Sequence, residues 1–271
     1  MIPQAFEYER PASLADAIGL LKQHGEGARI LAGGHSLLPM MKLRLAAPAT
    51  LIDISGVSGL NGIRDAGSYL AIGALATHRD VAESDIVRGG CPVLAATAAG
   101  VGDLQVRNRG TIGGSVAQAD PHADYPAVLL ALEGEAIVEG PGGQRTITAA
   151  DLFTGYLSTS VSDDEIVTEL RVPKVSQGAY VKFNRRKADW AIVGVAAVLA
   201  GSSARIALTG VAPTPVRAAA AEAAWNGSNA ADAASHAGEG LNPPSDTAAS
   251  GEYRVHLARV LTQRALEQAS A

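Results

Sequence analysis

Two paired-glycine segments restrict the folds open to this chain more than any other feature of its sequence. The first, Leu31–Ser36, reads Leu-Ala-Gly-Gly-His-Ser, and the second, Thr111–Ser115, reads Thr-Ile-Gly-Gly-Ser. Paired glycines allow positive φ and carry no Cβ, so an anionic group can come close to the backbone. Successive N–H groups then converge on the anion, and a following helix N-terminus adds to the attraction. The pattern predicts that both loops clamp one pyrophosphate; the alternative is two ordinary turns between a strand and a helix.

Other phosphate-binding motifs do not fit the sequence. No Gly-Lys-Ser or Gly-Lys-Thr occurs, which excludes a Walker-type loop. The segments nearest to a dinucleotide fingerprint, Gly25–Gly27 and Gly100–Gly102, lack both the third glycine and a preceding strand. We therefore expect a nucleotide bound on a scaffold other than the Rossmann fold.

The first two thirds of the chain alternate short helices and strands. Ser13 is the expected N-cap of the first helix, with Asp16 as its capping-box partner. We expect helices over residues 13–23, 36–45, 77–84, 91–101 and 125–132. We expect strands over 28–32, 50–54 and 165–172, and hairpins that pair 62–64 with 69–73 and 136–139 with 144–148. The segment 28–54 therefore reads as a compact β-α-β-like unit.

The pattern of expected strands and helices changes in the last third of the chain. Three strand-like runs, at 179–186, 190–200 and 204–212, predict an antiparallel meander. Alanine-rich helical sequence follows from Val216, and residues 238–250 form a linker. In the final helix, one buried face is expected to hold Tyr253, Leu257, Val260, Leu261 and Leu266. The fold class is α+β, in three subdomains over residues 1–57, 58–176 and 177–271.

Composition removes several classes of function. The chain has 22 Lys and Arg against 27 Asp and Glu, a net charge of −5, which argues against nucleic acid or an anionic membrane as the main partner. A single cysteine, Cys91, excludes a disulfide framework, a cysteine-ligated zinc site and an iron–sulfur cluster held by this chain alone. Cys91 precedes a proline at an expected helix start, and its role is structural or that of a partial thiolate.

Neither a metal site nor membrane insertion is expected. The six histidines show no pair at metal-ligand spacing. No segment approaches the roughly 18 consecutive apolar residues of a membrane helix. The N-terminus shows no signal peptide, so the expected location is cytoplasmic.

Four stretches of the sequence, in this order, resemble the FAD-binding medium subunit of molybdenum hydroxylases, the relatives of carbon monoxide dehydrogenase and xanthine dehydrogenase. They lie at residues 32–42, at 107–115 with 120–126, at 182–191, and at 244–246 with 252–254 and 260–261. The resemblance covers nearly the whole chain. It implies a PCMH-type FAD fold, in which two N-terminal α+β subdomains hold the dinucleotide between them and a C-terminal subdomain carries an antiparallel sheet and helices.

The resemblance also implies site residues. Backbone N–H groups would bind the FAD pyrophosphate at Ala32, Gly33, Gly34, His35, Ser36, Thr111, Ile112, Gly113, Gly114 and Ser115. Asp124 would hydrogen-bond flavin-side hydroxyls, or else serve as a helix N-cap. Lys187 would lie near the isoalloxazine, or else be a solvated charge in the run 185–187. Trp190 would cover the flavin ring, or else be a half-buried strand residue. Ala188 stands where a glycine is common, which leaves the local backbone shape open.

The function implied is electron transfer, with no catalytic residue on this chain. Electrons would pass from [2Fe-2S] clusters on a small subunit through FAD to an external acceptor such as a quinone or NAD. The molybdenum cofactor would lie on a large subunit, in a dimer of heterotrimers. Alternatives are a stand-alone FAD-dependent oxidoreductase of the same fold and a non-catalytic assembly protein that has lost the cofactor. Carbon monoxide, an aldehyde, a purine or another N-heterocycle all stay open as the substrate at the molybdenum site.

Overall fold

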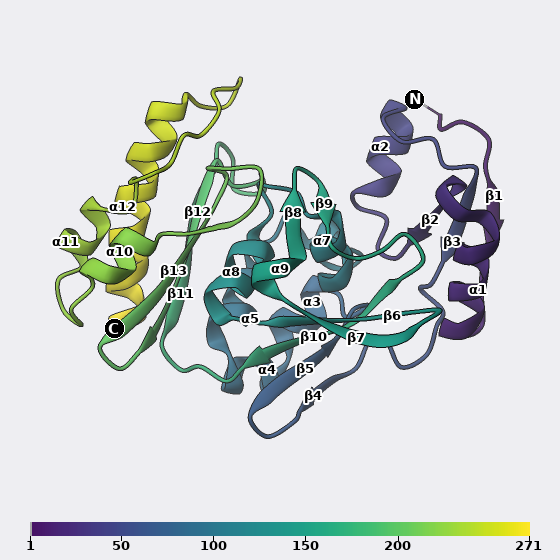
Figure 1. Cartoon of the computed structure of the whole chain (residues 1–271), viewed down its shortest axis with the longest axis horizontal. Helices are drawn as coiled ribbons and strands as arrows, with labels where there is room; N and C mark the ends of the chain where they lie inside the picture. The colour runs from purple at the N-terminus through teal and green to yellow at the C-terminus, as the bar shows by residue number, and fades with distance from the viewer. Residues whose placement is uncertain (1) are drawn as a thin grey trace.

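The computed structural model describes residues 2–271 and has the mixed helix and sheet architecture predicted from the sequence, of α+β class. Figure 1 shows the main sheets side by side, with the N-terminal part of the chain at one end and the C-terminal part at the other. Within residues 2–271, no helix is long and apolar enough to cross a membrane. The division at residues 57 and 176 stays a prediction.

The N-terminal sheet confirms the predicted β-α-β unit. It contains β1 (Glu7–Glu9), β2 (Ala28–Leu31) and β3 (Thr50–Asp53), in the order β1-β3-β2. Both outer strands run parallel to β3. The connecting helices are α1 (Leu14–His24) and α2 (Leu37–Leu43), with the 3-10 turn η1 (Gly25–Gly27) after α1. Ser13 caps α1 as expected, because its hydroxyl oxygen accepts the Asp16 N–H at 3.1 Å.

The middle part of the chain is built around β10, which pairs antiparallel with β5 and β6. Its sheet has the order β4-β5-β10-β6-β7. The strands are β4 (Ile63–Asp65), β5 (Tyr69–Gly73), β6 (Glu135–Gly140), β7 (Gly143–Thr148) and β10 (Ile166–Pro173), with a separate short hairpin of β8 (Phe153–Gly155) and β9 (Ser158–Thr159). The helices are α3 (His78–Glu83), α4 (Asp85–Gly90), α5 (Pro92–Ala99), α6 (Leu104–Arg107), α7 (Ile112–Gln118), α8 (Asp124–Leu132) and α9 (Ala149–Leu152). Both hairpins predicted here are confirmed.

The C-terminal part is the predicted antiparallel meander, with shifted boundaries. Its strands are β11 (Gly178–Phe183), β12 (Val193–Ala200), β13 (Ser203–Thr209) and β14 (Val216–Arg217), and its helices are α10 (Ala219–Ala224), α11 (Ala230–Ser235) and α12 (Gly251–Ser270). The helix predicted from Val216 begins later, because Val216–Arg217 pairs with β13 as a fourth strand. The strand predicted over 190–200 begins at Val193, and residues 184–192 form a connection between β11 and β12.

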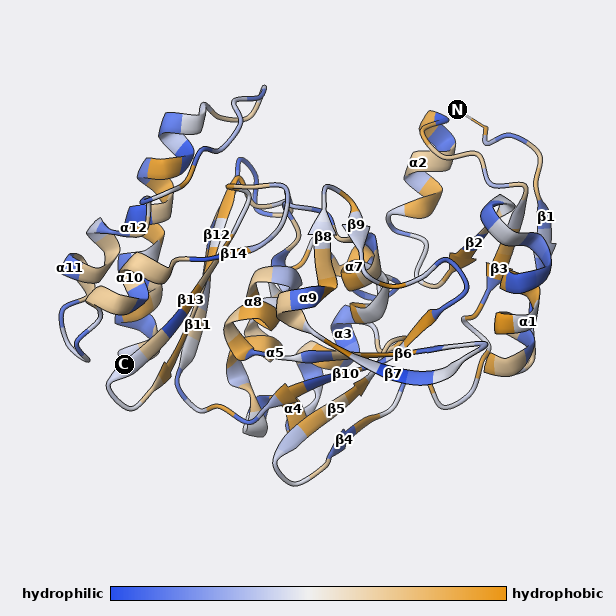
Figure 2. Cartoon of the chain, viewed as in Figure 1, coloured by the Kyte–Doolittle hydropathy of each residue, from blue (hydrophilic) through white to orange (hydrophobic). Residues whose placement is uncertain are grey.

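Strand β12 joins the middle and C-terminal parts into one body. Helix α8 packs against β12 and β13, and α12 packs against β11 and β12. Residues 193–198 are consequently all buried, as is every residue of α8. Figure 2 shows hydrophobic residues along β5 and α8 and on part of α12. Because apolar surface buried in this way contributes roughly 25 cal/mol per Å², the junction around β12 is a stable frame for the residues at its edge.

Candidate functional site

The two paired-glycine loops, 80 positions apart in the chain, meet in the structure. A Cβ added to Gly33 would lie 2.2 Å from the carbonyl oxygen of Arg109 and 2.8 Å from the Cα of Gly110. Arg109 and Gly110 lead directly into the second loop. The helices that follow the loops also approach each other, because the Gln118 Nε2 lies 3.9 Å from the Met40 Sδ. The structure therefore brings the two loops together, and that both border one ligand site stays a prediction.

The first loop offers a run of free donors. Among residues 2–271 we find no hydrogen-bond acceptor for the backbone N–H groups of residues 33–37. Its carbonyls are in use: the Gly34 oxygen accepts the Leu38 N–H at 3.1 Å, and the Gly33 oxygen faces the His35 Nδ1 at 3.1 Å. Gly34 has a φ of 75°, which favours glycine. Consecutive free N–H groups at a helix start are typical of an anion site, and these residues fit the pyrophosphate of a dinucleotide.

The second loop uses most of its donors within the chain. Ile112 and Gly113 donate to the carbonyls of Ala76 and Ala74, both at 3.0 Å. Thr111 caps α7, and its hydroxyl oxygen accepts the Gly114 N–H at 3.1 Å. The Ser115 N–H makes the first helical bond, to the Thr111 carbonyl at 3.0 Å. The pyrophosphate role implied for residues 111–115 stays a prediction, and in this structure the consecutive run of free N–H groups lies in the first loop.

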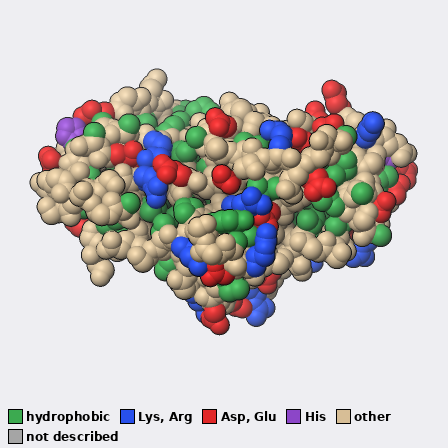
Figure 3. All heavy atoms as spheres, turned by 60° about the horizontal axis from the view of Figure 1, so that its bottom comes forward, with side chains coloured by type: hydrophobic (Ala, Val, Ile, Leu, Met, Phe, Trp, Pro, Cys, Tyr) green, Lys and Arg blue, Asp and Glu red, His purple; other side chains and the backbone are tan. Residues whose placement is uncertain are grey.

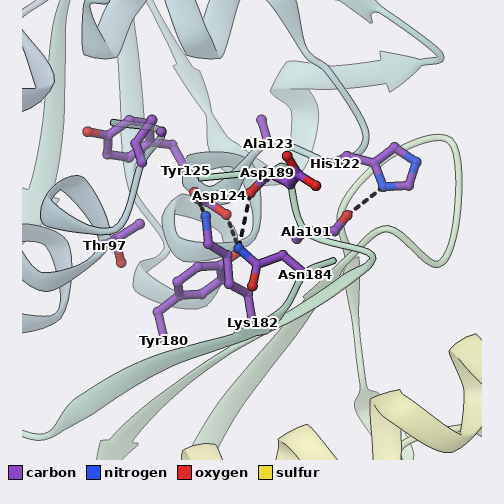
Figure 4. A network of polar contacts seen from close by, with 12 residues as sticks. Thr97, His122, Ala123, Asp124, Tyr125, Tyr180, Lys182, Asn184, Asp189 and Ala191 are labelled. Atoms are coloured by element: carbon purple, nitrogen blue, oxygen red, sulfur yellow. Dashed lines mark hydrogen bonds and ion pairs between the residues drawn. The ribbon is translucent and has the colours of Figure 1, made fainter. Parts of the chain in front are cut away.

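Asp124 is not a helix N-cap. Ala123 holds that position and no side chain caps α8, so the N-cap alternative is wrong. The Asp124 carboxylate is 6% exposed and accepts hydrogen bonds from the Tyr180 hydroxyl at 2.6 Å and the Lys182 Nζ at 2.8 Å (Figure 4). Burial raises the pKa of this carboxyl, and Lys182 and Tyr180 act in the opposite direction. Its contact with flavin hydroxyls stays a prediction.

Sequence reasoning did not single out Tyr180 and Lys182 as the partners of Asp124. A signal was available, since side chains two residues apart in a strand point to the same face of a sheet. Both residues lie in β11. The sequence alone could not show that this face of β11 meets the start of α8, because the two segments lie 56 positions apart.

Lys187 and Trp190 lie in the connection between β11 and β12. Lys187 is exposed, and its carbonyl accepts a hydrogen bond from the Asn184 Nδ2 at 3.3 Å. Trp190 is 68% exposed and precedes the strand, so the half-buried strand alternative is wrong. A contact of either residue with the flavin stays a prediction.

His78 packs against the backbone at the start of the second loop. No pattern in the sequence predicts this role. Its backbone N–H donates to the Gly110 carbonyl at 2.9 Å, and a Cβ on Gly110 would lie 2.6 Å from the His78 Nε2. Its Nδ1 lies 3.1 Å from the Tyr125 hydroxyl. Burial lowers the pKa of His78 to about 4, and the nearby His35 and Arg107 act in the same direction. His78 is therefore neutral at physiological pH.

This buried histidine predicts a loss of stability in acid. The pKa of His78 falls from 6.5 in the unfolded chain to about 4 in the folded one. The contribution of neutral His78 to the free energy of unfolding is therefore complete above pH 6.5. It is lost as the pH falls from 6.5 toward 4, by roughly 3 kcal/mol in total. Denaturant unfolding between these pH values should show this slope, and His78→Gln should flatten it. An equal slope in the variant would contradict the assignment.

Two remaining sequence expectations concern cysteine and metal. Cys91 is buried, and burial raises the pKa of its thiol to about 11, so the partial-thiolate alternative is wrong and the structural role stands. Across residues 2–271, no group of three His, Cys, Asp or Glu side chains is arranged to hold a metal ion.

Comparison with known proteins matches this arrangement over nearly the whole chain. Residues 4–175 match the family model described as the FAD binding domain in molybdopterin dehydrogenase, and residues 178–269 match the CO dehydrogenase flavoprotein C-terminal domain. The carbon monoxide dehydrogenase medium chain of Hydrogenophaga pseudoflava is 43% identical over 284 aligned residues, which cover 100% of this chain and 99% of that one. The nicotine 6-hydroxylase medium subunit of Paenarthrobacter nicotinovorans is 40% identical, with 98% of each chain covered.

Solved structures agree. The structure of carbon monoxide dehydrogenase from Hydrogenophaga pseudoflava, in a form that lacks the Mo-pyranopterin moiety of the molybdenum cofactor, contains a chain that matches with a TM-score of 0.95 at 44% identity. The match covers 99% of this chain and 98% of that one. The resemblance stated from the four sequence stretches is confirmed: this chain belongs to the family of FAD-binding medium subunits of molybdenum hydroxylases, which are subunits of oxidoreductases.

Proposed function

We propose that this chain binds FAD and transfers electrons within a molybdenum-containing hydroxylase or dehydrogenase. Electrons would reach FAD from [2Fe-2S] clusters on a small partner subunit and leave to an external acceptor, such as a quinone or NAD. The observation that carries the proposal is the run of free N–H groups at residues 33–37, at the point where the two glycine loops meet. Five consecutive donors of this kind can satisfy the charge of a pyrophosphate without a lysine.

The residues of this chain bind and orient the cofactor in this proposal. The segments 32–36 and 111–115 border the pyrophosphate, Asp124 accepts hydrogen bonds from flavin-side hydroxyls, and Lys187 lies near the ring. FAD, when bound, supplies the ability to take up and deliver electrons singly or in pairs. We assign no general acid, general base or nucleophile to this chain.

The proposed partner subunits carry the cofactors that this chain has no ligands to hold. Its single cysteine is buried, and an iron–sulfur cluster needs several thiolate ligands. We therefore propose that the clusters lie on the small subunit and the molybdenum cofactor on the large one, in a dimer of heterotrimers. Medium chain and medium subunit are the names of the two relatives above, which supports an assembly of several subunits. A cytoplasmic location stays a prediction.

Purification of the native complex tests this function. We expect two flavin absorption bands, one FAD released per copy of this chain on denaturation, and molybdenum and iron in the same complex. A substrate panel on that complex would identify the molybdenum-site substrate. A purified complex without FAD would contradict the proposal, and so would substrate turnover by this chain alone, which is the expectation for a stand-alone oxidoreductase.

A further inference from the structure

Among the Lys and Arg residues of 2–271, Arg254 alone is buried, with 1% of its surface exposed. Figure 3 shows the usual case on one face of the molecule, where Lys and Arg side chains lie at the surface beside Asp and Glu side chains. Arg254 lies near the N-terminus of α12, where the helix dipole disfavours a positive charge. Burying a charge is costly unless polar partners replace the lost water. The reason for its burial therefore lies in partners outside the helix.

The Arg254 guanidinium holds the ends of two neighbouring strands. Its Nη1 donates to the carbonyl of Ile192, directly before β12, and to the carbonyl of Gly210, directly after β13, the latter at 2.9 Å. Its Nη2 binds the Asp246 carboxylate at 2.7 Å, in the segment before α12. The two strand ends also touch, because a Cβ added to Gly210 would lie 2.3 Å from the Ile192 carbonyl oxygen. Arg254 therefore fixes both strand ends against α12.

The end of β13 in turn holds the residues that lead into Asp124. The Thr209 hydroxyl reaches the carbonyl oxygens of Pro121 and Ala123, at 2.7 and 2.9 Å. The Gly210 N–H also donates to the Pro121 carbonyl, at 2.8 Å. Thr209 is 1% exposed, so water does not compete for these bonds. A movement of the β13 end would therefore carry the residues before Asp124 with it.

The start of β12 holds the connection 184–192 in a similar way. The Ile192 N–H donates to the Phe183 carbonyl at 2.8 Å and so closes the connection at its base. The His122 Nδ1 lies 2.8 Å from the Ala191 carbonyl oxygen and ties the connection to the residues before α8 (Figure 4). The buried guanidinium takes the next carbonyl, that of Ile192. One buried cation thus anchors both the connection and the residues before α8.

We propose that Arg254 is a positioning residue for the bound flavin. Through the two strand ends it sets the position of Asp124 and of the connection 184–192, which are expected at the flavin-side hydroxyls and near the ring. The inference rests on the proposed function, because it assigns the residue that aligns the groups around the flavin end of FAD. The free N–H groups of residues 33–37 belong to the first loop. Loss of Arg254 should therefore disturb the ring and leave the FAD content unchanged.

Stability alone does not account for an arginine at this position. The Arg254 Nε is buried and has no hydrogen-bond partner among residues 2–271, a cost that an apolar side chain avoids. Buried ion pairs are often no more stable than apolar residues of similar volume. A guanidinium offers instead a rigid planar fork of donors, which fixes the direction of each acceptor. The side chain is therefore suited to aligning the strand ends.

Amide hydrogen exchange in the full chain without cofactor tests this alignment. Arg254→Met keeps most of the side-chain volume and removes every donor. The N–H groups of Ile192 and Gly210 should then exchange about tenfold faster relative to the central amides of β12, because the strand ends open locally. The matched control is Leu266→Ala, which leaves a cavity near the C-terminal end of α12 and should not change this relative rate. An unchanged rate in Arg254→Met, or an equal rise in Leu266→Ala, overturns the proposal.

The visible circular dichroism of the flavin is the second measurement, made on the FAD-loaded complex. It reports how uniformly the ring is held, which a merely structural role of Arg254 would not change. We expect Arg254→Met to keep the wild-type FAD content and to lose visible dichroism. Arg254→Lys, which keeps a cation but lacks the planar fork, should lose less, and Leu266→Ala should lose none. A wild-type spectrum in Arg254→Met, or an equal loss in Leu266→Ala, overturns the proposal. A wild-type complex without FAD contradicts the proposed function, while the exchange measurement still tests the alignment.

Thr209→Val makes the test independent of whether Arg254→Met folds. It keeps the shape of the side chain, leaves Arg254 in place and removes the hydroxyl that reaches the Pro121 and Ala123 carbonyls. We expect the same loss of visible dichroism at wild-type FAD content. A wild-type spectrum in Thr209→Val overturns the proposal, because the strand end would then not position the residues before Asp124.

Discussion

Gly33→Ala is expected to abolish FAD retention, with at least about a tenfold loss of flavin content in the purified chain. The added Cβ would lie 2.2 Å from the Arg109 carbonyl oxygen and 2.9 Å from the Arg109 carbonyl carbon. Both are backbone atoms, which cannot swing aside as the end of a flexible side chain can. The two loops must separate, and the free N–H groups of residues 33–37 move with the first of them. Losing one charge-assisted hydrogen bond costs about 1.5–3 kcal/mol, and 1.4 kcal/mol is already tenfold in affinity.

A glycine in the same part of the chain provides the control. Gly19 lies in α1, and a Cβ there would meet nothing within 4 Å. Gly19→Ala should keep full flavin content and gain about 0.5–1 kcal/mol of unfolding free energy, since glycine weakens a helix interior. Flavin absorbance per protein and denaturant unfolding measure both effects. The prediction fails if Gly33→Ala unfolds cooperatively and still carries wild-type amounts of FAD.

A substitution at Gly113 is a less informative test of flavin binding than one at Gly33, although both loops contain the same pair of glycines. It is buried, and a Cβ there would lie 2.4 Å from the Ala74 Cβ. Its N–H also donates to the Ala74 carbonyl. A substitution would disturb the core beneath α7 together with any ligand site, so loss of flavin would have two causes. The paired glycines predict close approach at both loops, and in the structure other parts of the chain approach both: Arg109 and Gly110 lie against Gly33, and Ala74 lies against Gly113.

Local pattern predicted the elements of this fold well, because these depend on neighbouring residues. The hairpins, the β-α-β unit and the meander follow from alternation, turn residues and caps, and all are confirmed. What the pattern could not show is which elements pack together. The contact of Gly33 with Arg109 and the pair of Asp124 with Lys182 each join segments more than 50 positions apart.

The start of α12 shows how a distant partner reverses a local expectation. Helical spacing predicted Tyr253 on the buried face, but Tyr253 is 42% exposed and its neighbour Arg254 is 1% exposed. Arg254 can be buried because its guanidinium donates to the Ile192 and Gly210 carbonyls and to the Asp246 carboxylate. These acceptors come from three separate segments. A buried charge needs partners of this kind, and helical periodicity contains no information about them.

Lys182→Met should lower the unfolding free energy by about 3–5 kcal/mol at neutral pH, because it leaves the buried Asp124 carboxylate without its counter-charge. The side chains of Lys182 and Asp124 are 13% and 6% exposed, so water cannot replace the lost partner. The exposed pair of Lys174 and Asp65 is the matched control. Lys174→Met should cost no more than about 1 kcal/mol, and chemical unfolding of both variants measures the difference.

The pH dependence separates an unpaired charge from lost packing. Burial already raises the pKa of Asp124, and Lys182 opposes that effect. Without Lys182 the pKa rises further above its value in the unfolded chain, so the folded state takes up a proton more readily than the unfolded one. The stability of Lys182→Met should therefore recover as the pH falls through that raised pKa, whereas a loss of packing would persist. Asp124→Asn in the same background should restore most of the loss at neutral pH, because the unpaired charge is then absent. The prediction fails if the stability of Lys182→Met is independent of pH and its loss of unfolding free energy is no larger than that of Lys174→Met. That result would show that the pair of Lys182 and Asp124 does not hold α8 to β11.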